Sequence, residues 1–60
     1  MKLVFEIDEK PFAIQLHKRS KHVFRVTYGY QVDDHLTYAE AAAKLGQAIM
    51  HRAACDGLLD

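Results

Sequence analysis

The sequence predicts a small α+β domain: a three-stranded antiparallel β-meander followed by one C-terminal α-helix that packs on one face of the sheet (β-β-β-α). In the first half, apolar and polar residues alternate with a period of two, which indicates an antiparallel sheet with one buried and one wet face. The second half changes to a helical period with clear start and stop signals. The chain has 60 residues, of which 50% are hydrophobic and 27% charged, so we expect one domain spanning residues 1–60.

Three runs carry the alternation. Their apolar faces consist of Leu3, Phe5 and Ile7 in the first run, Phe12, Ile14 and Leu16 in the second, and Phe24, Val26, Tyr28, Tyr30 and Val32 in the third. Neighbouring faces can be set opposite each other if Ile7 pairs with Phe12 and Leu16 pairs with Phe24. This register predicts a loop over Asp8–Pro11 and a hairpin tip over Arg19–Lys21. Pro11 would then open the second strand, where a missing N–H is tolerated.

The helix is marked at both ends. Thr37 and Glu40 have the spacing of a capping box, in which each side chain bonds the other residue's backbone N–H. The helix is predicted to run through 41–54. Gly57 suits the position just past the helix end, with Leu58 folding back in a Schellman-type ending.

The predicted helix has more apolar surface than one sheet requires. At about 100° per residue, a broad face points at the sheet and a narrow polar stripe lies beside it. The sheet-facing residues are Tyr38, Ala41, Ala42, Leu45, Ala48, Ile49 and Ala53, with the Arg52 stem at the edge, and the stripe is Glu40, Lys44, Gln47 and His51. The remaining sector is uncharged and consists of Ala39, Ala43, Gly46, Met50 and Ala54.

This uncharged sector is our candidate protein interface. Its small residues let another backbone approach closely, and Met50 is an adaptable contact residue. The alternative is that alanine is present only because it is the best helix former. A chain of this size buries only about 60% of its unfolded surface, and one cysteine allows no intramolecular disulfide. We therefore expect oligomerisation, as a homodimer, to add stability.

We expect no catalytic residues and no cofactor. His51 and Cys55 lie one helical turn apart, but a helix C-terminus disfavours a thiolate. The acidic run 33–35 is more simply the turn before the helix. A chain this small also lacks room for a substrate pocket.

We expect no metal site either. His51 and Cys55 could supply two ligands and His35 a third, whereas structural zinc normally has four. His17 and His22 flank the basic tip, where they are expected to be solvated.

Charge is unevenly distributed. The net formal charge is zero, but residues 1–30 hold six Lys and Arg against three Asp and Glu, or +3, and residues 31–60 hold two against five, or −3. Lys18, Arg19, Lys21 and Arg25 gather at the second hairpin, which gives an alternative function of nucleic-acid binding through phosphate contacts. The wet face carries no aromatic platform for single strands, and a charged tip that keeps a hairpin soluble is the other interpretation.

The segment HVFRVTYGY leading to TYAEAAAKLGQAI resembles the C-terminal two-thirds of a double-stranded-RNA-binding domain. It is similar also to the partial form of that fold in HicB-type antitoxins, where a strand leads into a Thr-x-x-Glu-Ala helix. The resemblance covers about forty residues. It implies a sheet with one helix across it and, in the HicB-like case, binding to a partner protein. Residues 37–40 stand where the RNA-binding family carries its lysine cluster.

The sequence thus predicts a small non-catalytic interaction or regulatory module, homodimeric and acting by binding a larger protein, through the uncharged helix sector or an exposed edge strand. No apolar run reaches the length of a membrane span, and MKLVFEIDEK meets acidic residues too early for a signal peptide. Together with the free Cys55, this favours the cytoplasm. Nucleic-acid binding remains the alternative.

Overall fold

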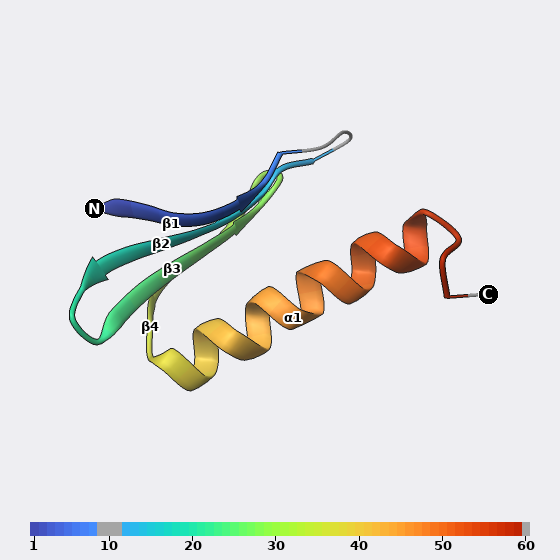
Figure 1. Ribbon diagram of the computed structural model, residues 1–60. Helices are drawn as coiled ribbons and strands as arrows, with labels where there is room; N and C mark the ends of the chain where they lie inside the picture. Colours follow the sequence, from blue (N-terminus) through green and yellow to red (C-terminus); the bar gives the residue numbers. More distant parts are fainter. Residues whose placement is uncertain (9–11, 60) are drawn as a thin grey trace.

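A computed structural model describes residues 1–8 and 12–59 of the chain. It shows one antiparallel sheet in the order β1-β2-β3-β4, with helix α1 on one face (Figure 1). The α+β class is confirmed, but the sheet has four strands where we predicted three. The elements are β1 (Lys2–Ile7), β2 (Ile14–Ser20), β3 (Val23–Tyr28), β4 (Gln31–Leu36) and α1 (Tyr38–Cys55).

The fourth strand arises because Gly29 breaks the third predicted run. Tyr28 pairs with Gln31, so Gly29 and Tyr30 form a two-residue hairpin loop. Gly29 has φ 60°, the positive value that a type II′ turn requires at its first loop position. A Cβ at this position would also lie 2.8 Å from the ring of Phe12. Glycine is therefore required here for two independent reasons.

The hairpin registers differ from the prediction by two residues. Ile7 lies opposite Ile14 where we predicted Phe12, and Leu16 lies opposite Val26 where we predicted Phe24. A shift of two keeps each residue on its face, so the apolar faces survive the error. The predicted Asp8–Pro11 loop, and Pro11 with it, falls largely outside the described residues.

Both edge strands contain a bulge. In β1 the register shifts between Leu3 and Phe5, so Leu3 lies opposite His17 and leaves the face that we predicted for it. In β4 two residues, Asp34 and His35, occupy the space opposite one residue of β3. His35 takes φ 55°, an uncommon value for a side chain other than glycine. Bulges of this kind interrupt the regular row of N–H and C=O groups along an edge.

The predicted helix ends are confirmed. The Glu40 N–H donates to Thr37 Oγ1 at 3.2 Å, and the Thr37 N–H donates to Glu40 Oε1 at 3.0 Å. At the other end, the Gly57 and Leu58 N–H groups donate to carbonyls of the last turn at 3.1 and 3.0 Å, the two bonds of a Schellman motif. Among the described residues, no helix combines the length and the apolar character that crossing a bilayer would require.

The core between sheet and helix is small. Its buried apolar side chains are Ile14, Val26, Ala41 and Ala48. Arg52 is buried with them at 8% exposure, and its Nη1 donates to the Phe12 carbonyl oxygen at 2.6 Å. Because Phe12 precedes β2, this bond ties the C-terminal half of α1 to the far end of the sheet.

Replacing Arg52 with methionine should lower stability. Methionine keeps most of the apolar stem but leaves the Phe12 carbonyl without its donor, at a cost of about 1–3 kcal/mol. In a domain of this size each kcal/mol lowers Tm by about 4–8 °C, which thermal denaturation by circular dichroism can measure. Gln47→Met, at an exposed position of the same helix, is the control. An Arg52→Met protein that melts with the control would contradict this role.

Candidate protein-interaction surface

Helix α1 is too narrow to cover the whole sheet. It packs against β2, β3 and β4 and leaves β1 at the side (Figure 1). A helix is about 10 Å across, whereas four strands spaced about 4.8 Å apart span roughly 14 Å between the outer two. One helix therefore leaves about one strand of this sheet uncovered.

The uncovered strand presents apolar side chains on the helix side of the sheet. Phe5 and Ile7 lie opposite Leu16 and Ile14, and residues that oppose each other across a ladder share a face. Phe5 is 46% exposed, while Ile14, one strand further in, is fully buried. The apolar face that we predicted is thus present, but only its inner part is covered.

The flank of α1 that faces β1 is also apolar and open. We predicted that Tyr38, Ala42 and Ile49 would cover the sheet. The Tyr38 ring does pack edge-to-face on Phe24 of β3, with 6.2 Å between ring centroids. The cover is incomplete, however, because Tyr38 is 77% exposed, Ile49 is 39% exposed, and Ala42 is exposed. A shallow groove of about 140 Å³ separates helix and sheet here, and its lining is Leu16, Phe24, Tyr38, Ala41, Ala42 and Leu45.

The predicted interface residues all lie on the outer face of α1, next to this flank. A Cβ added to Gly46 would meet nothing within 4 Å, and Met50 is 58% exposed. Together with the exposed flank of α1, and with Phe5 on the helix side of β1, they make up a set of exposed, uncharged residues. We call this set the apolar surface; it consists of Phe5, Tyr38, Ala39, Ala42, Ala43, Gly46, Ile49, Met50 and Ala54, all of them exposed.

The opposite flank of α1, toward β4, is polar. A cleft of about 210 Å³ separates it from β3 and β4. Within it Gln31 Nε2 donates to Asp33 Oδ2 at 3.2 Å, and Lys44 Nζ lies 4.0 Å from Asp33 Oδ1. The helix therefore has a clear division between a polar β4 side and an apolar β1 side.

The only cysteine lies beside a histidine, as the sequence indicated. Cys55 Sγ is 3.6 Å from His51 Nε2, and both residues are exposed. Within the described part of the chain, no group of three or more His, Cys, Asp or Glu side chains is placed to hold a metal ion. The pair therefore has no third ligand there.

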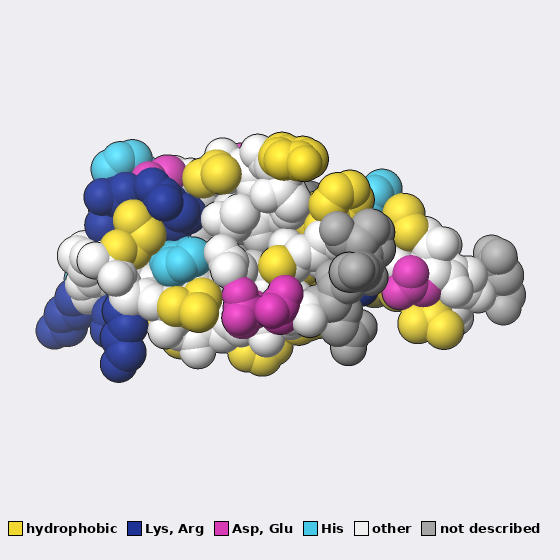
Figure 2. Space-filling model, turned by 90° about the horizontal axis from the view of Figure 1, so that it is seen from above, with side chains coloured by type: hydrophobic (Ala, Val, Ile, Leu, Met, Phe, Trp, Pro, Cys, Tyr) yellow, Lys and Arg dark blue, Asp and Glu magenta, His cyan; other side chains and the backbone are white. Residues whose placement is uncertain are grey.

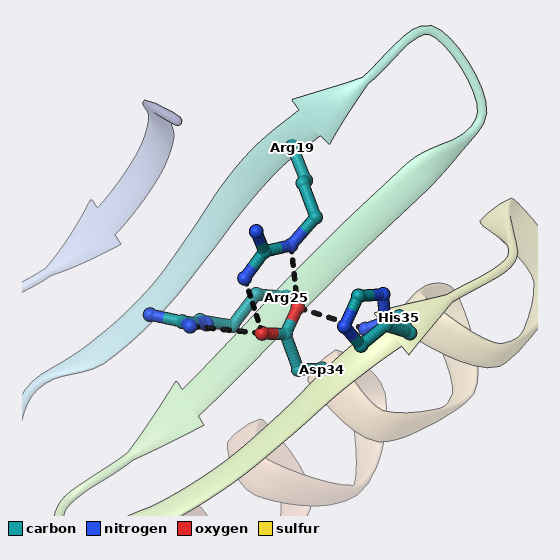
Figure 3. A network of polar contacts seen from close by, with 4 residues as sticks. All are labelled: Arg19, Arg25, Asp34 and His35. Carbon is teal, nitrogen blue, oxygen red and sulfur yellow. Dashed lines mark hydrogen bonds and ion pairs between the residues drawn. The ribbon is translucent and has the colours of Figure 1, made fainter.

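An ion-pair network on the outer face of the sheet involves two of the predicted nucleic-acid contacts. Arg19 donates to both carboxylate oxygens of Asp34, at 3.1 and 2.5 Å, and Arg25 Nη2 donates to Asp34 Oδ2 at 2.8 Å (Figure 3). The His35 N–H donates to Asp34 Oδ1 at 2.8 Å. The β4 bulge places Asp34 in this position, which the sequence pattern missed because it assigned 33–35 to a turn.

The network changes the acidity of Asp34. Hydrogen bonds from Arg19, and then from Arg25, hold the pKa of the Asp34 carboxyl well below its usual range. At the helix start, the hydrogen bonds from the Thr37 backbone N–H and side chain lower the pKa of Glu40. Both carboxylates therefore stay ionised at any physiological pH.

The lysines of the basic end are differently placed. Lys2 lies directly opposite Lys18, and no ion pair joins Lys2, Lys18 or Lys21 to a carboxylate in the described residues. Basic side chains gather at the end of the molecule that holds the β2–β3 turn (Figure 2). This end of the molecule therefore retains positive charge that no carboxylate of the described residues neutralises. Like charges directly opposite each other also weaken the pairing of β1 with β2.

The Asp34 network should make stability depend on pH in the acid range. Because the folded-state pKa of Asp34 lies below its unfolded value of about 3.9, its contribution is fully present above that value and is lost as the pH falls below it. Asp34→Asn should lower Tm at pH 7, and the difference from the unmodified protein should shrink as the pH falls from about 5 toward 2. Melting curves over this range measure both. A difference that stays constant with pH would show that the charge of Asp34 is not what matters.

No protein-family model, curated protein or solved structure matches this chain.

Proposed function

We propose that this protein is a small non-catalytic interaction module that acts by binding another protein, either a second copy of itself or a larger protein that it regulates. The observation that carries the proposal is the apolar surface, which combines the exposed flank and outer face of α1 with Phe5 on the helix side of β1. It is uncharged, and charge depletion together with aromatic and methionine side chains distinguishes the core of protein interfaces.

Exposed alanines alone would not support this function, because alanine is common on solvated helices. The larger side chains do. Phe5, Tyr38, Ile49 and Met50 are each between 39% and 77% exposed, and they all belong to the apolar surface. Contiguous exposed apolar patches on small proteins mark interaction sites.

A capture experiment with matched variants tests this function. The tagged protein is used to capture partners from an extract of its source cells, followed by mass spectrometry. Gly46→Glu and Ile49→Glu place a charge in the apolar surface and should abolish capture, because burying an unpaired charge is costly. Gln47→Glu, one residue away on the polar stripe, should retain it. Gly46→Glu should not harm the fold, since the site is open and glutamate favours helix more than glycine does.

If all three variants capture the same proteins in the same amounts, binding does not use the apolar surface and the proposal is wrong. Thermal melts of each variant establish that a loss of capture is not a loss of folding.

Nucleic-acid binding remains a second candidate function because of the lysine cluster at the hairpin end. Arg19 and Arg25 are engaged by Asp34, so Lys18 and Lys21, joined by Lys2, are the better candidates for phosphate contact. The supporting observation is that Lys2 and Lys18 oppose each other without a carboxylate partner in the described part of the chain.

If the lysines bind phosphates, replacing Lys2, Lys18 and Lys21 with alanine should abolish a gel shift of duplex DNA or RNA, and the shift should weaken steeply with added salt. Lys44→Ala, in the polar cleft, is the control and should shift the nucleic acid like the unmodified protein. Absence of any shift at low salt would eliminate this candidate.

A further inference from the structure

We propose that the occupant of the apolar surface is a second copy of this chain, and that α1 of each copy lies beside α1 of the other, over its uncovered strand β1. This inference rests on the proposed function, because it names the partner that the interaction module binds. It goes further by stating how the two copies are arranged.

The side of the sheet beyond α1 is open. Phe5 and Ile7 of β1 lie there on the helix side of the sheet, opposite Leu16 and Ile14 of β2, and the groove along the helix flank is lined by Leu16 and Phe24. Helices pack at about 8–10 Å between axes, so a helix beside α1 would rest over the next one or two strands, which here are β1 and β2. The chain itself supplies such a helix.

Symmetry then decides the orientation of the two helices. Each helix must lie over β1 of the other copy, and each sheet must stay packed against its own helix. A two-fold axis that runs along the helices, midway between them, meets both conditions. It places the helices side by side and roughly parallel in one layer, with the two sheets outside. The contact is isologous, as in most homodimers.

This arrangement accounts for every apolar side of α1. Its inner face, with Ala41 and Ala48, packs on its own sheet. Its flank, with Ala42 and Ile49, would meet the other helix, and its outer face, with Met50, would rest on β1 of the second copy. Only the stripe toward β4 would remain in water, and that is where the polar residues of the helix lie.

The areas agree with a dimer. The chain exposes 4392 Å², whereas a compact monomer of its mass, 6.9 kDa, would expose about 4,000 Å². A standard interface buries about 800 Å² per partner. The apolar surface runs along α1, which at 18 residues is about 27 Å long.

Other self-associations fit less well. Pairing of two β1 edges would join the sheets but leave the helix side of β1 uncovered in both copies, and the bulge beside Leu3 interrupts that edge. Charge does not oppose the dimer, because the net formal charge is zero. Parallel helices would also bring Glu40 of one copy to the same end as Lys2 and Lys18 of the other.

Sedimentation equilibrium across a range of concentrations tests the dimer. The unmodified protein should sediment as a dimer, and Gly46→Glu and Ile49→Glu should shift it to monomer. Phe5→Ser should weaken association at least tenfold, because it removes the apolar side chain of β1 on which the second helix would rest. Gln47→Glu should remain dimeric. A monomer at all concentrations would overturn this inference, whereas variant-sensitive capture of a different protein would still support the proposed function.

The native Cys55 gives a test of orientation. It is the only cysteine of the chain and is exposed, so one spin label can be attached without further substitution. Parallel helices about 10 Å apart should give a short distance between the two labels, about 15–20 Å. Antiparallel helices would separate the labels by about a helix length, 27 Å or more, and that result would overturn the arrangement. A dimer that survives Gly46→Glu and Ile49→Glu unchanged would overturn it as well.

Discussion

The width of one helix relative to four strands is the constraint from which the rest of this structure follows. Because α1 packs mainly against β2, β3 and β4, Phe5 of β1 and the side chains of the adjoining helix flank stay exposed. The buried apolar core is correspondingly reduced to Ile14, Val26, Ala41 and Ala48. A larger protein would add a second helix over β1. In this protein, the position over β1 is available to a helix of another molecule.

Polar contacts hold the parts that the small core does not reach. Arg52 fastens the second half of α1 to the segment before β2. On the outer face, Asp34 joins β4 to the hairpin through Arg19 and Arg25. The Arg52 contact spans 40 residues and the Arg19 contact 15, and each uses arginine, whose fork of donors can satisfy carbonyl or carboxylate oxygens in a fixed geometry. The two ends of the molecule are thus tied by hydrogen bonds where apolar contact is sparse.

The fold class and the helix ends could be predicted from sequence because both depend on local patterns. A period of two marks strands, and Thr37 with Glu40 and Gly57 mark the helix. The fourth strand was missed because the alternation runs on through Tyr30 and Val32; the signal that would have revealed it is Gly29, which together with the next residue forms a two-residue hairpin loop. The exposed outer face of the helix could be predicted from the helical period, whereas the exposure of Ile49 could not, because it depends on where the helix axis crosses the sheet.

The strand order also has a consequence for how the chain folds. Every strand pairs with its neighbour in sequence, so each ladder can form by closing a short loop, and chains rich in such local contacts fold rapidly. The Arg52 bond to Phe12 instead spans 40 residues and can form only after the sheet exists. We therefore expect the hairpins to assemble first and the helix to dock last. Until it docks, the helix presents apolar residues on nearly all sides, so that docking onto its own sheet and encounter with a second chain become competing events at high concentration.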